Sequence, residues 1–299
     1  FRRVLFRSSQ LPTWLLCGEM RHHVTVALSG DGGDEVFGGY HRHVHAATAW
    51  HRGRRVPAPL RRLLSAGVLA LSPEAWDAAF APMRPVLPSR LRLRSPGQSL
   101  HKWARCFGAD SEAAAYASLT VITGAIGTAS TDWWREADAQ RLPDFLRRMQ
   151  FMDQTGYMVD DVLVKVDRAS MAHGLEVRVP LLDHRLLEFA WSVPAHMKVR
   201  NGRGKWLLRE MLRARVPSAV LDAPKTGFGV PLGSWLRGPL REWAADLLST
   251  SQARQDPLLS RERIERSWSR LIGSSDAPQH ELWAVLMYLA WARQWKVAS

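Results

Sequence analysis

Apolar residues recur along this chain mainly at helical spacing, and strand-like patterns are rare. Residues 10–22 predict a helix, and the apolar run at 24–28 predicts a buried strand. A glycine-rich stretch comes next, and a second helix is expected to start near Asp34 and to run through Tyr40. Helix, strand, loop and helix in this order are typical of a parallel α/β sheet, in which ligands bind beyond the carboxyl ends of the strands.

The second half of the chain carries stronger helical patterns. Residues 160–174 predict a helix whose final glycine suits a left-handed cap, and an extended segment follows at 175–179. Asp183 is expected to cap the next helix, and another helix is expected at 204–217. The last helix, at 280–295, is apolar around most of its circumference, so we expect it to be buried against other helices.

Residues 50–110 are rich in Arg, Pro and Ala, and we interpret them as short helices and loops on the surface. Only one convincing strand, at 24–28, stands among the many helices. A parallel sheet needs several strands, so the pattern predicts that the rest of the sheet lies outside this chain.

Composition indicates a folded protein with a basic surface. The 299 residues are 46% hydrophobic and 23% charged, as in an ordinary globular chain. The net charge of +13 suits nucleotides, nucleic acid or an acidic membrane, although scattered arginines are more simply explained as solvated helix faces. Cys17 and Cys106 make neither a disulfide framework nor a zinc set, and no apolar run approaches the ~20 residues that span a bilayer. We therefore expect a cytoplasmic protein.

The stretch LSGDGGDEVFGGY, residues 28–40, carries the first candidate chemistry. Its glycine-rich backbone can hold an anion, yet Asp31 and Asp34 would repel phosphate unless a cation lies between them. Magnesium takes oxygen ligands and bridges to phosphate oxygens, so the stretch favours a Mg²⁺–nucleotide site. The alternative is an acidic surface turn in which glycine serves only for positive φ.

A second stretch, LDAPKTGFGVPLGSW at residues 221–235, places Lys225 in a turn bounded by prolines and glycines. A lysine held in such a turn can stabilise the negative charge that develops on phosphate as a bond breaks. The alternative is an ordinary lysine in a surface turn.

A third stretch alternates charges. Asp167 and Arg168 lie in a predicted helix, and Glu176 and Arg178 lie in the extended segment between apolar neighbours, where we expect them to be half buried. Buried charges need partners, so these four residues predict an ionic network that supports a site. A helix face stabilised by ion pairs is the alternative.

Taken in order, SGDGGDEVFGGY, VKVDRASMAHGLEVRVPLLDHR and PKTGFGVPLGSWLRGPLREW resemble the synthetase domain of glutamine-dependent asparagine synthetases. The resemblance runs from about Ser8 to the C-terminus, and residues 1–7 look unrelated to it. It implies an α/β fold, namely part of an adenine-nucleotide alpha-hydrolase-like (PP-loop) parallel sheet with a large, mostly helical C-terminal part.

The resemblance also implies a reaction. The family uses ATP and Mg²⁺ to adenylate the side-chain carboxylate of aspartate, and ammonia from glutamine then displaces AMP. At the matching positions, Ser29 and Gly30 would contact the nucleotide, and Asp31 would serve the adenylation step. Asp34 would be tied to metal and pyrophosphate, and Lys225 would stabilise the transition state that forms pyrophosphate.

Two departures from the family pattern are visible. Family members begin with a glutaminase domain whose N-terminal cysteine attacks glutamine, whereas residue 1 here is Phe. They also carry an SGGxDS pyrophosphate loop ahead of the first stretch, and that string is absent here. We therefore expect a C-terminal portion of a synthetase domain, residues 8–299, that is inactive by itself.

Three other functions stay open. The motifs serve adenylation and do not read the substrate, so the first is an amide-forming ligase for another carboxylate, such as a peptide, a lactam precursor or a cell-surface precursor. The second is a nucleic-acid-binding module, which requires basic residues gathered on one face with aromatics between them. The third is a non-catalytic fragment. The expected partners are aspartate, ATP and ammonia, with no membrane and no nucleic acid, and a homodimer is allowed.

Overall fold

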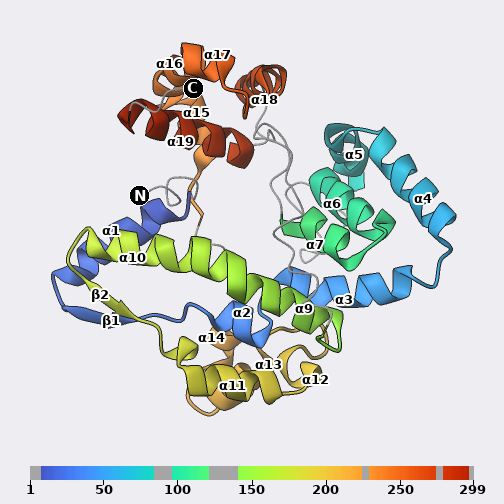
Figure 1. Cartoon of the computed structure of the whole chain (residues 1–299), viewed down its shortest axis with the longest axis vertical. Helices are drawn as coiled ribbons and strands as arrows, with labels where there is room; N and C mark the ends of the chain where they lie inside the picture. The colour runs from blue at the N-terminus through green and yellow to red at the C-terminus, as the bar shows by residue number, and fades with distance from the viewer. Residues whose placement is uncertain (1–7, 84–95, 121–140, 224–228, 274–278, 296–299) are drawn as a thin grey trace.

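The computed structural model describes residues 8–83, 96–120, 141–223, 229–273 and 279–295. Helices make up most of the fold, and the described sheet has two short strands, β1 (Val26–Leu28) and β2 (Glu176–Arg178) (Figure 1). The strands are parallel, with Ala27 opposite Val177. The α/β class is confirmed. The prediction of a single strand is wrong, because the extended segment at 175–179 supplies a parallel partner.

The remaining elements are helical. In chain order they are α1 (Gln10–Arg21), α2 (Gly33–Phe37), α3 (His41–Gly53), α4 (Ala58–Ala70), α5 (Pro73–Phe80), a 3₁₀ turn (Ala81–Met83), α6 (Pro96–Gly108), α7 (Glu112–Thr120), α9 (Phe145–Met152), a π-helix (Asp153–Leu163), α10 (Val164–Met171), a 3₁₀ turn (Pro180–Leu182), α11 (His184–Ser192), α12 (Ala195–Lys198), α13 (Trp206–Leu212), α14 (Ser218–Leu221), α15 (Leu232–Arg237), α16 (Arg241–Ser249), α17 (Ser251–Gln255), α18 (Arg261–Gly273) and α19 (Gln279–Trp295). Within the described residues, none of these helices is long and apolar enough to cross a membrane.

Several helix ends follow the local sequence signals. α1 packs against α10 beside the sheet, and Gly174 adopts φ +66° just after α10, which confirms the left-handed cap. The Asp183 side chain accepts a hydrogen bond from the Arg185 N–H at 3.0 Å, which confirms the cap of α11. The second predicted helix ends earlier than expected, at Phe37, because Gly38 turns into the left-handed region at φ +72°.

α9, the π-helix and α10 run as one continuous rod across the centre of the molecule (Figure 1). The π-helical part is 11 residues long. Such wide turns are rare in proteins and occur most often near functional sites. No pattern in the sequence predicted this widening.

The described residues of the segment 50–110 form longer helices than we expected. α4 and α6 have 13 residues each, and one core joins Trp50, Cys106, Tyr116 and Phe145 from four different helices. The interpretation as short surface helices and loops holds for α5, which has no buried residue. It is wrong for α6, because this helix turns an apolar face toward the interior that it shares with α3, α7 and α9. We call α3 to α7 the middle helical unit.

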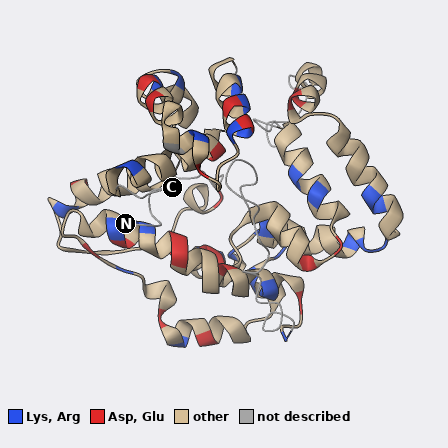
Figure 2. Cartoon of the chain, turned by 45° about the horizontal axis from the view of Figure 1, so that its top comes forward, with Lys and Arg blue, Asp and Glu red and all other residues tan. Residues whose placement is uncertain are grey.

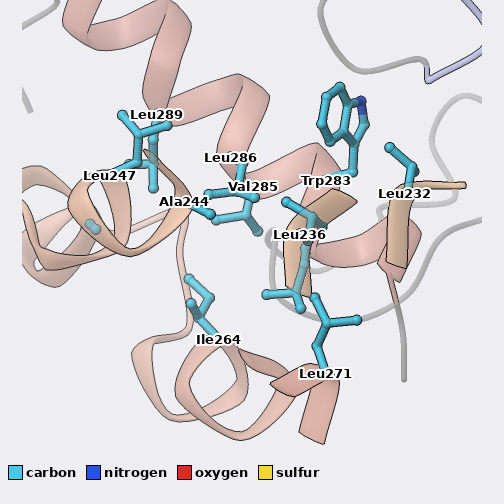
Figure 3. Packing of buried hydrophobic residues seen from close by; sticks show 12 residues of the cluster. Leu232, Leu236, Ala244, Leu247, Ile264, Leu271, Trp283, Val285, Leu286 and Leu289 are labelled. Atoms are coloured by element: carbon cyan, nitrogen blue, oxygen red, sulfur yellow. The ribbon is translucent and has the colours of Figure 1, made fainter. Parts of the chain in front are cut away.

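Helices α15 to α19 form a second unit, the C-terminal helical unit, around a core of its own. Leu236, Leu271 and Leu286 come from three different helices and are completely buried. Figure 3 shows side chains of α15, α16, α18 and α19 directed toward one shared interior. The expected burial of the last helix is confirmed.

Candidate functional site

The glycine-rich stretch forms the loop that leaves the carboxyl end of β1 and enters α2. Because β1 and β2 are parallel, both end at this edge, where the Ser29 N–H donates to the Arg178 carbonyl at 2.8 Å. Gly32 adopts φ +82° at the start of α2, a left-handed conformation that favours glycine. The loop therefore lies where ligands of parallel α/β sheets bind.

Ser29, Gly30 and Asp31 form the tip of this loop. The Ser29 hydroxyl donates to the Asp31 carboxylate, and the Asp31 N–H donates to the Ser29 oxygen at 3.2 Å. Gly30 is exposed, and a Cβ built on it would meet no described atom within 4 Å. The tip thus holds a partly exposed carboxylate next to backbone that a ligand can approach closely.

Asp34, one turn further along, is paired with a lysine from a distant segment. Lys205 Nζ lies 3.1 Å from Asp34 Oδ1, and the two side chains are 31% and 24% exposed. The Lys205 backbone N–H also donates to the Phe37 carbonyl at 3.1 Å. Lys205 has φ +55°, a conformation that costs a residue with a Cβ about 1–2 kcal/mol. The surrounding contacts therefore hold this ammonium at the loop against an intrinsic backbone preference.

Two glycines allow this close approach. A Cβ on Gly39 would collide with the Asp34 carboxylate and with the Lys205 side chain. A Cβ on Gly204 would collide with the carbonyl oxygen of Gly38. Glycine at both positions lets the segment before α13 lie against the turn that follows α2.

A buried polar network lies behind α2. At its centre is Asp153, the first residue of the π-helix, whose side chain is fully buried. Arg42 donates to both of its carboxylate oxygens, at 3.1 and 2.7 Å. His43 Nε2 lies 2.6 Å from the same carboxylate, and the Tyr116 hydroxyl donates to it. One carboxylate thus joins α3, α7 and the central rod.

Polar side chains reach α2 by two routes, one from this network and one from Gln150 of α9. The Arg42 guanidinium lies 3.9 Å from the ring centroid of Tyr40, whose hydroxyl donates to the buried Glu35 carboxylate. Gln150 Nε2 donates at 2.9 Å to the Glu35 carbonyl and at 2.8 Å to the next carbonyl along the chain. Both routes end on the residue that directly follows Asp34. The network therefore orients the short helix that carries the Asp34 carboxylate.

Burial and partners set the charges of this network. Burial alone would raise the pKa of Asp153, but the hydrogen bonds and charges of His43 and Arg42 outweigh it and hold that pKa below its usual range. Burial lowers the pKa of His43, which favours the neutral imidazole. Burial and the Arg147 charge lower the pKa of Lys198 to about 8, and its ammonium donates to Gln150 Oε1 at 3.3 Å.

The four charged residues of the third stretch do not join into one buried network here. Asp167 and Arg168 are neighbours in the chain and both are exposed. The Arg168 Nε atom lies 3.8 Å from the Asp167 Oδ2 atom. Glu176 and Arg178 pair at 2.7 Å, but the expectation that they are half buried is wrong, because their side chains are 55% and 65% exposed. Leu28, the register partner of Arg178, is 73% exposed as well, so no described layer covers this face of the sheet.

The structure thus places Ser29, Gly30 and Asp31 in the loop that follows β1, and Asp34 in the first turn of α2, which this loop enters. Lys225 lies outside the described residues.

Two important residues were missed by the sequence reasoning. A signal for Lys205 was present, because the segment Asn201–Lys205 reads NGRGK and is a glycine-rich turn that enters a helix, as the first stretch is. Asp153 had no local signal, because its partner Arg42 is 111 residues away.

The loop offers oxygen ligands of the kind that Mg²⁺ prefers. The described residues contain no group of three His, Cys, Asp or Glu side chains that could hold a metal. Magnesium is usually held by one or two carboxylates together with phosphate oxygens and water. Asp31 and Asp34 supply two carboxylates on one loop, so the donor set fits a Mg²⁺ ion that arrives with phosphate.

Fold and loop together define an α/β protein with an acidic, glycine-rich loop at the carboxyl edge of its parallel strands. The model of the family described as asparagine synthase matches residues 2–293, nearly the whole chain. The chain belongs to the asparagine synthase family.

Individual relatives agree with this membership. The chain is 27% identical to asparagine synthetase [glutamine-hydrolyzing] 1 of Bacillus subtilis over 283 residues, which are 94% of this chain and 42% of that protein. It is 25% identical to asparagine synthetase [glutamine-hydrolyzing] 3 of the same organism, over 84% of this chain and 34% of that protein. A 75-residue segment, 24% of this chain, is 41% identical to human asparagine synthetase [glutamine-hydrolyzing] and spans 13% of it. The chain therefore spans less than half the length of these relatives.

Proposed function

We propose that this chain supplies synthetase machinery to a glutamine-dependent asparagine synthetase. In this proposal, ATP adenylates the side-chain carboxylate of aspartate, which yields β-aspartyl-AMP and pyrophosphate. Ammonia from glutamine, released by a glutaminase domain, then displaces AMP and forms asparagine. Family membership supports the reaction class. The observation that carries the proposal is the loop beyond β1, where Asp31 is followed within one turn by the Asp34–Lys205 pair.

Each residue of the loop has a proposed task. Ser29 and Gly30 lie at the exposed tip and would contact the nucleotide, because their backbone can be approached closely. Asp31 would serve the adenylation step, and Asp34 would face metal and pyrophosphate. Lys205 would exchange its carboxylate partner for phosphate oxygens when the nucleotide binds. Lys225 would stabilise the charge that develops on the departing pyrophosphate.

Magnesium would be held by Asp34 and Asp31 together with the phosphates of ATP. When bound, it supplies Lewis-acid charge stabilisation on phosphate oxygens. The residues of the chain would orient the nucleotide, and the ammonium of Lys205, which lies beside Asp34, would reduce the repulsion between that carboxylate and phosphate.

Other expectations stay predictions at this point. They are the domain limits 8–299, the supporting role of Asp167, Arg168, Glu176 and Arg178, the cytoplasmic location, the homodimer and the absence of nucleic acid. Figure 2 shows basic and acidic positions interspersed over the described helices, which favours solvated helix faces over one basic nucleic-acid-binding face.

The proposal is tested by Asp31→Asn in the full-length protein. Aspartate-dependent exchange of pyrophosphate into ATP should be abolished, because the adenylation step loses its carboxylate. Glutamine hydrolysis should be retained, because it belongs to another domain. Asp246→Asn, which changes an exposed carboxylate of the C-terminal helical unit, is the matched control and should leave exchange unchanged. Normal exchange in the Asp31 variant would remove this residue from the site.

The acceptor is tested in the same assay. Exchange that depends on aspartate supports asparagine formation. Exchange that depends instead on a peptide carboxylate or on a lactam precursor would keep the adenylation chemistry and replace the substrate.

A further inference from the structure

A concave surface lies away from the loop beyond β1, between α6 of the middle helical unit and α18 of the C-terminal helical unit. It is a cavity of about 400 Å³, and residues of α5, α7 and α19 complete its lining. Pockets of small-molecule ligands in proteins usually measure about 300–1,000 Å³. None of its lining residues belongs to the loop beyond β1. We call this cavity the basic groove.

The two helices turn regular stripes of residues into the basic groove. On α6 the lining residues are Gln98, His101, Lys102 and Arg105. On α18 they are Arg263, Arg266, Ser267 and Arg270. Both sets follow the spacing of three, four and seven residues that places side chains on one face of a helix. Two cationic helix faces from distant parts of the sequence therefore meet across one cavity.

The charges in the basic groove are only partly balanced. Five cationic side chains line it, against the two carboxylates of Glu74 and Glu281. Arg270 pairs with Glu74, and Arg266 pairs with Glu262 at 2.8 Å. The other three cations, Lys102, Arg105 and Arg263, make no ion pair or hydrogen bond to the described residues.

The unpaired cations are nevertheless reachable from solvent. Lys102, Arg105 and Arg263 are all exposed. Desolvation by the surrounding protein and the charge of Arg42 lower the pKa of Lys102, so that this ammonium is held at an electrostatic cost. Like charges on facing helices repel, and an anion bound between them would remove that repulsion.

The basic groove also joins two separately packed units. The core around Tyr116 belongs to the middle helical unit, and the core around Leu271 belongs to the C-terminal helical unit. The Arg270–Glu74 ion pair connects the two units beside the cavity. A ligand that touches α6 and α18 together would add contacts between two bodies that have separate cores.

We propose that the basic groove binds a small oxyanion ligand of the phosphate class that carries at least two negative charges. Arg105 and Lys102 hold one end of the ligand from α6, and Arg263 holds the other end from α18. Guanidinium groups are suited to this task, because their planar fork pairs with two oxygens of a phosphate at once. Binding would fasten the C-terminal helical unit to the middle helical unit.

The test uses the full-length protein and inorganic pyrophosphate as the probe. Binding is measured by calorimetry in the presence of a chelator, so that Mg²⁺-dependent binding at the loop beyond β1 does not contribute. The double variant Arg105→Gln/Arg263→Gln should weaken binding by about tenfold for each lost charged contact. The control Arg62→Gln/Arg185→Gln removes the same charge from two exposed arginines outside the cavity and should leave binding within twofold.

A second measurement tests whether the ligand stabilises the contact between the middle helical unit and the C-terminal helical unit. Hydrogen exchange of the α6 and α18 backbone should slow together when pyrophosphate is added to the wild type, and should not change in the double variant. Three results would overturn the proposal. They are the absence of pyrophosphate binding, equal weakening in the control variant, and binding that is lost in Asp34→Asn but kept in the groove variant. The last result would assign the anion to the loop of the proposed reaction instead.

Discussion

The region around α2 and the C-terminal helical unit are held together in opposite ways. Behind α2 the interior contains charged and polar side chains, with Asp153 and Gln150 completely buried and Lys198 nearly so. In the C-terminal helical unit the large buried cluster is apolar (Figure 3), and among the described residues of this unit only Asp256 and Ser267 are buried polar side chains. The stability of the first region depends on directional hydrogen bonds, and the stability of the second depends on close packing of apolar side chains.

This difference indicates in which region the orientation of the backbone and side chains has to be fixed. A buried polar network is stabilising only when each member keeps its partner, but it then fixes one arrangement of the chain. An apolar core accepts many arrangements of similar volume. The network lies behind the helix that carries Asp34, and the apolar core lies in a unit that holds no residue of the candidate site. Four predictions test this contrast, beginning with the largest effect.

Asp153→Asn should cause the largest loss of stability. The substitution keeps the size of the side chain but removes the charge, so the Arg42 guanidinium, only 16% exposed, loses its carboxylate partner. Breaking a buried charge pair in this way costs about 3–5 kcal/mol. Urea unfolding followed by circular dichroism measures the change in the free energy of unfolding.

A carboxylate on the surface provides the control for this variant. Asp246→Asn breaks the Asp246–Arg293 pair, whose side chains are 60% and 61% exposed, and should cost no more than about 1 kcal/mol. Equal losses in the two variants would show that the buried network has no special role in stability.

The contrast also explains how much of the molecule could be predicted from sequence. The strand, the helix at 280–295 and the acidic loop have local signals, namely apolar runs and glycine spacing, and all three are observed. The expectation that the strand at 24–28 is buried is wrong, because β1 spans only Val26–Leu28 and the side chains of Val26 and Leu28 are exposed. The partner of Asp34 depends on a contact across 171 residues of chain, and the partners of Asp153 come from α3 and α7. No local pattern of apolar and polar residues encodes such contacts, so the polar region was the harder one to predict.

Gly204→Ala should cause the next largest effect, because it lies in the segment that brings Lys205 close to Asp34 of α2. The new Cβ would collide with the carbonyl oxygen of Gly38, which is backbone and cannot rotate away. Overpacking of this kind costs about 1–3 kcal/mol and should also move Lys205 away from Asp34. Thermal unfolding and pyrophosphate exchange measure the two consequences.

Gly273→Ala, in the C-terminal helical unit, is the matched control. An added Cβ there meets no atom of the described residues within 4 Å, so the stability should stay within about 0.5 kcal/mol of the wild type. If Gly204→Ala were equally harmless in both assays, the close approach of the two segments would not be required.

Lys198 should give the polar region a pH dependence. Its pKa in the folded protein is about 8, below the ordinary value of 10.5. The unfolded chain therefore binds more protons between these values, and the contribution of Lys198 to stability rises with pH by up to about 1.4 kcal/mol per unit. Lys198→Met should remove this rise. The difference in unfolding free energy between variant and wild type, followed from about pH 8 to 9.5, isolates it from other titrating groups. A difference that does not change with pH would contradict the lowered pKa.

Leu286→Met should cause the smallest effect, although Leu286 is as fully buried as Asp153. Its neighbours in the core are apolar and make no directional bond to it, so a flexible side chain of similar volume can fill the same space. The expected cost is below about 1.5 kcal/mol, whereas Leu286→Ala, which leaves a cavity, should cost about 2–5 kcal/mol. Measured by the same urea unfolding, the methionine variant should therefore lose far less stability than Asp153→Asn, even though both substitutions nearly conserve volume. A loss of 3 kcal/mol or more in the methionine variant would show that the C-terminal core also depends on one fixed geometry, and the contrast between the two regions would then fail.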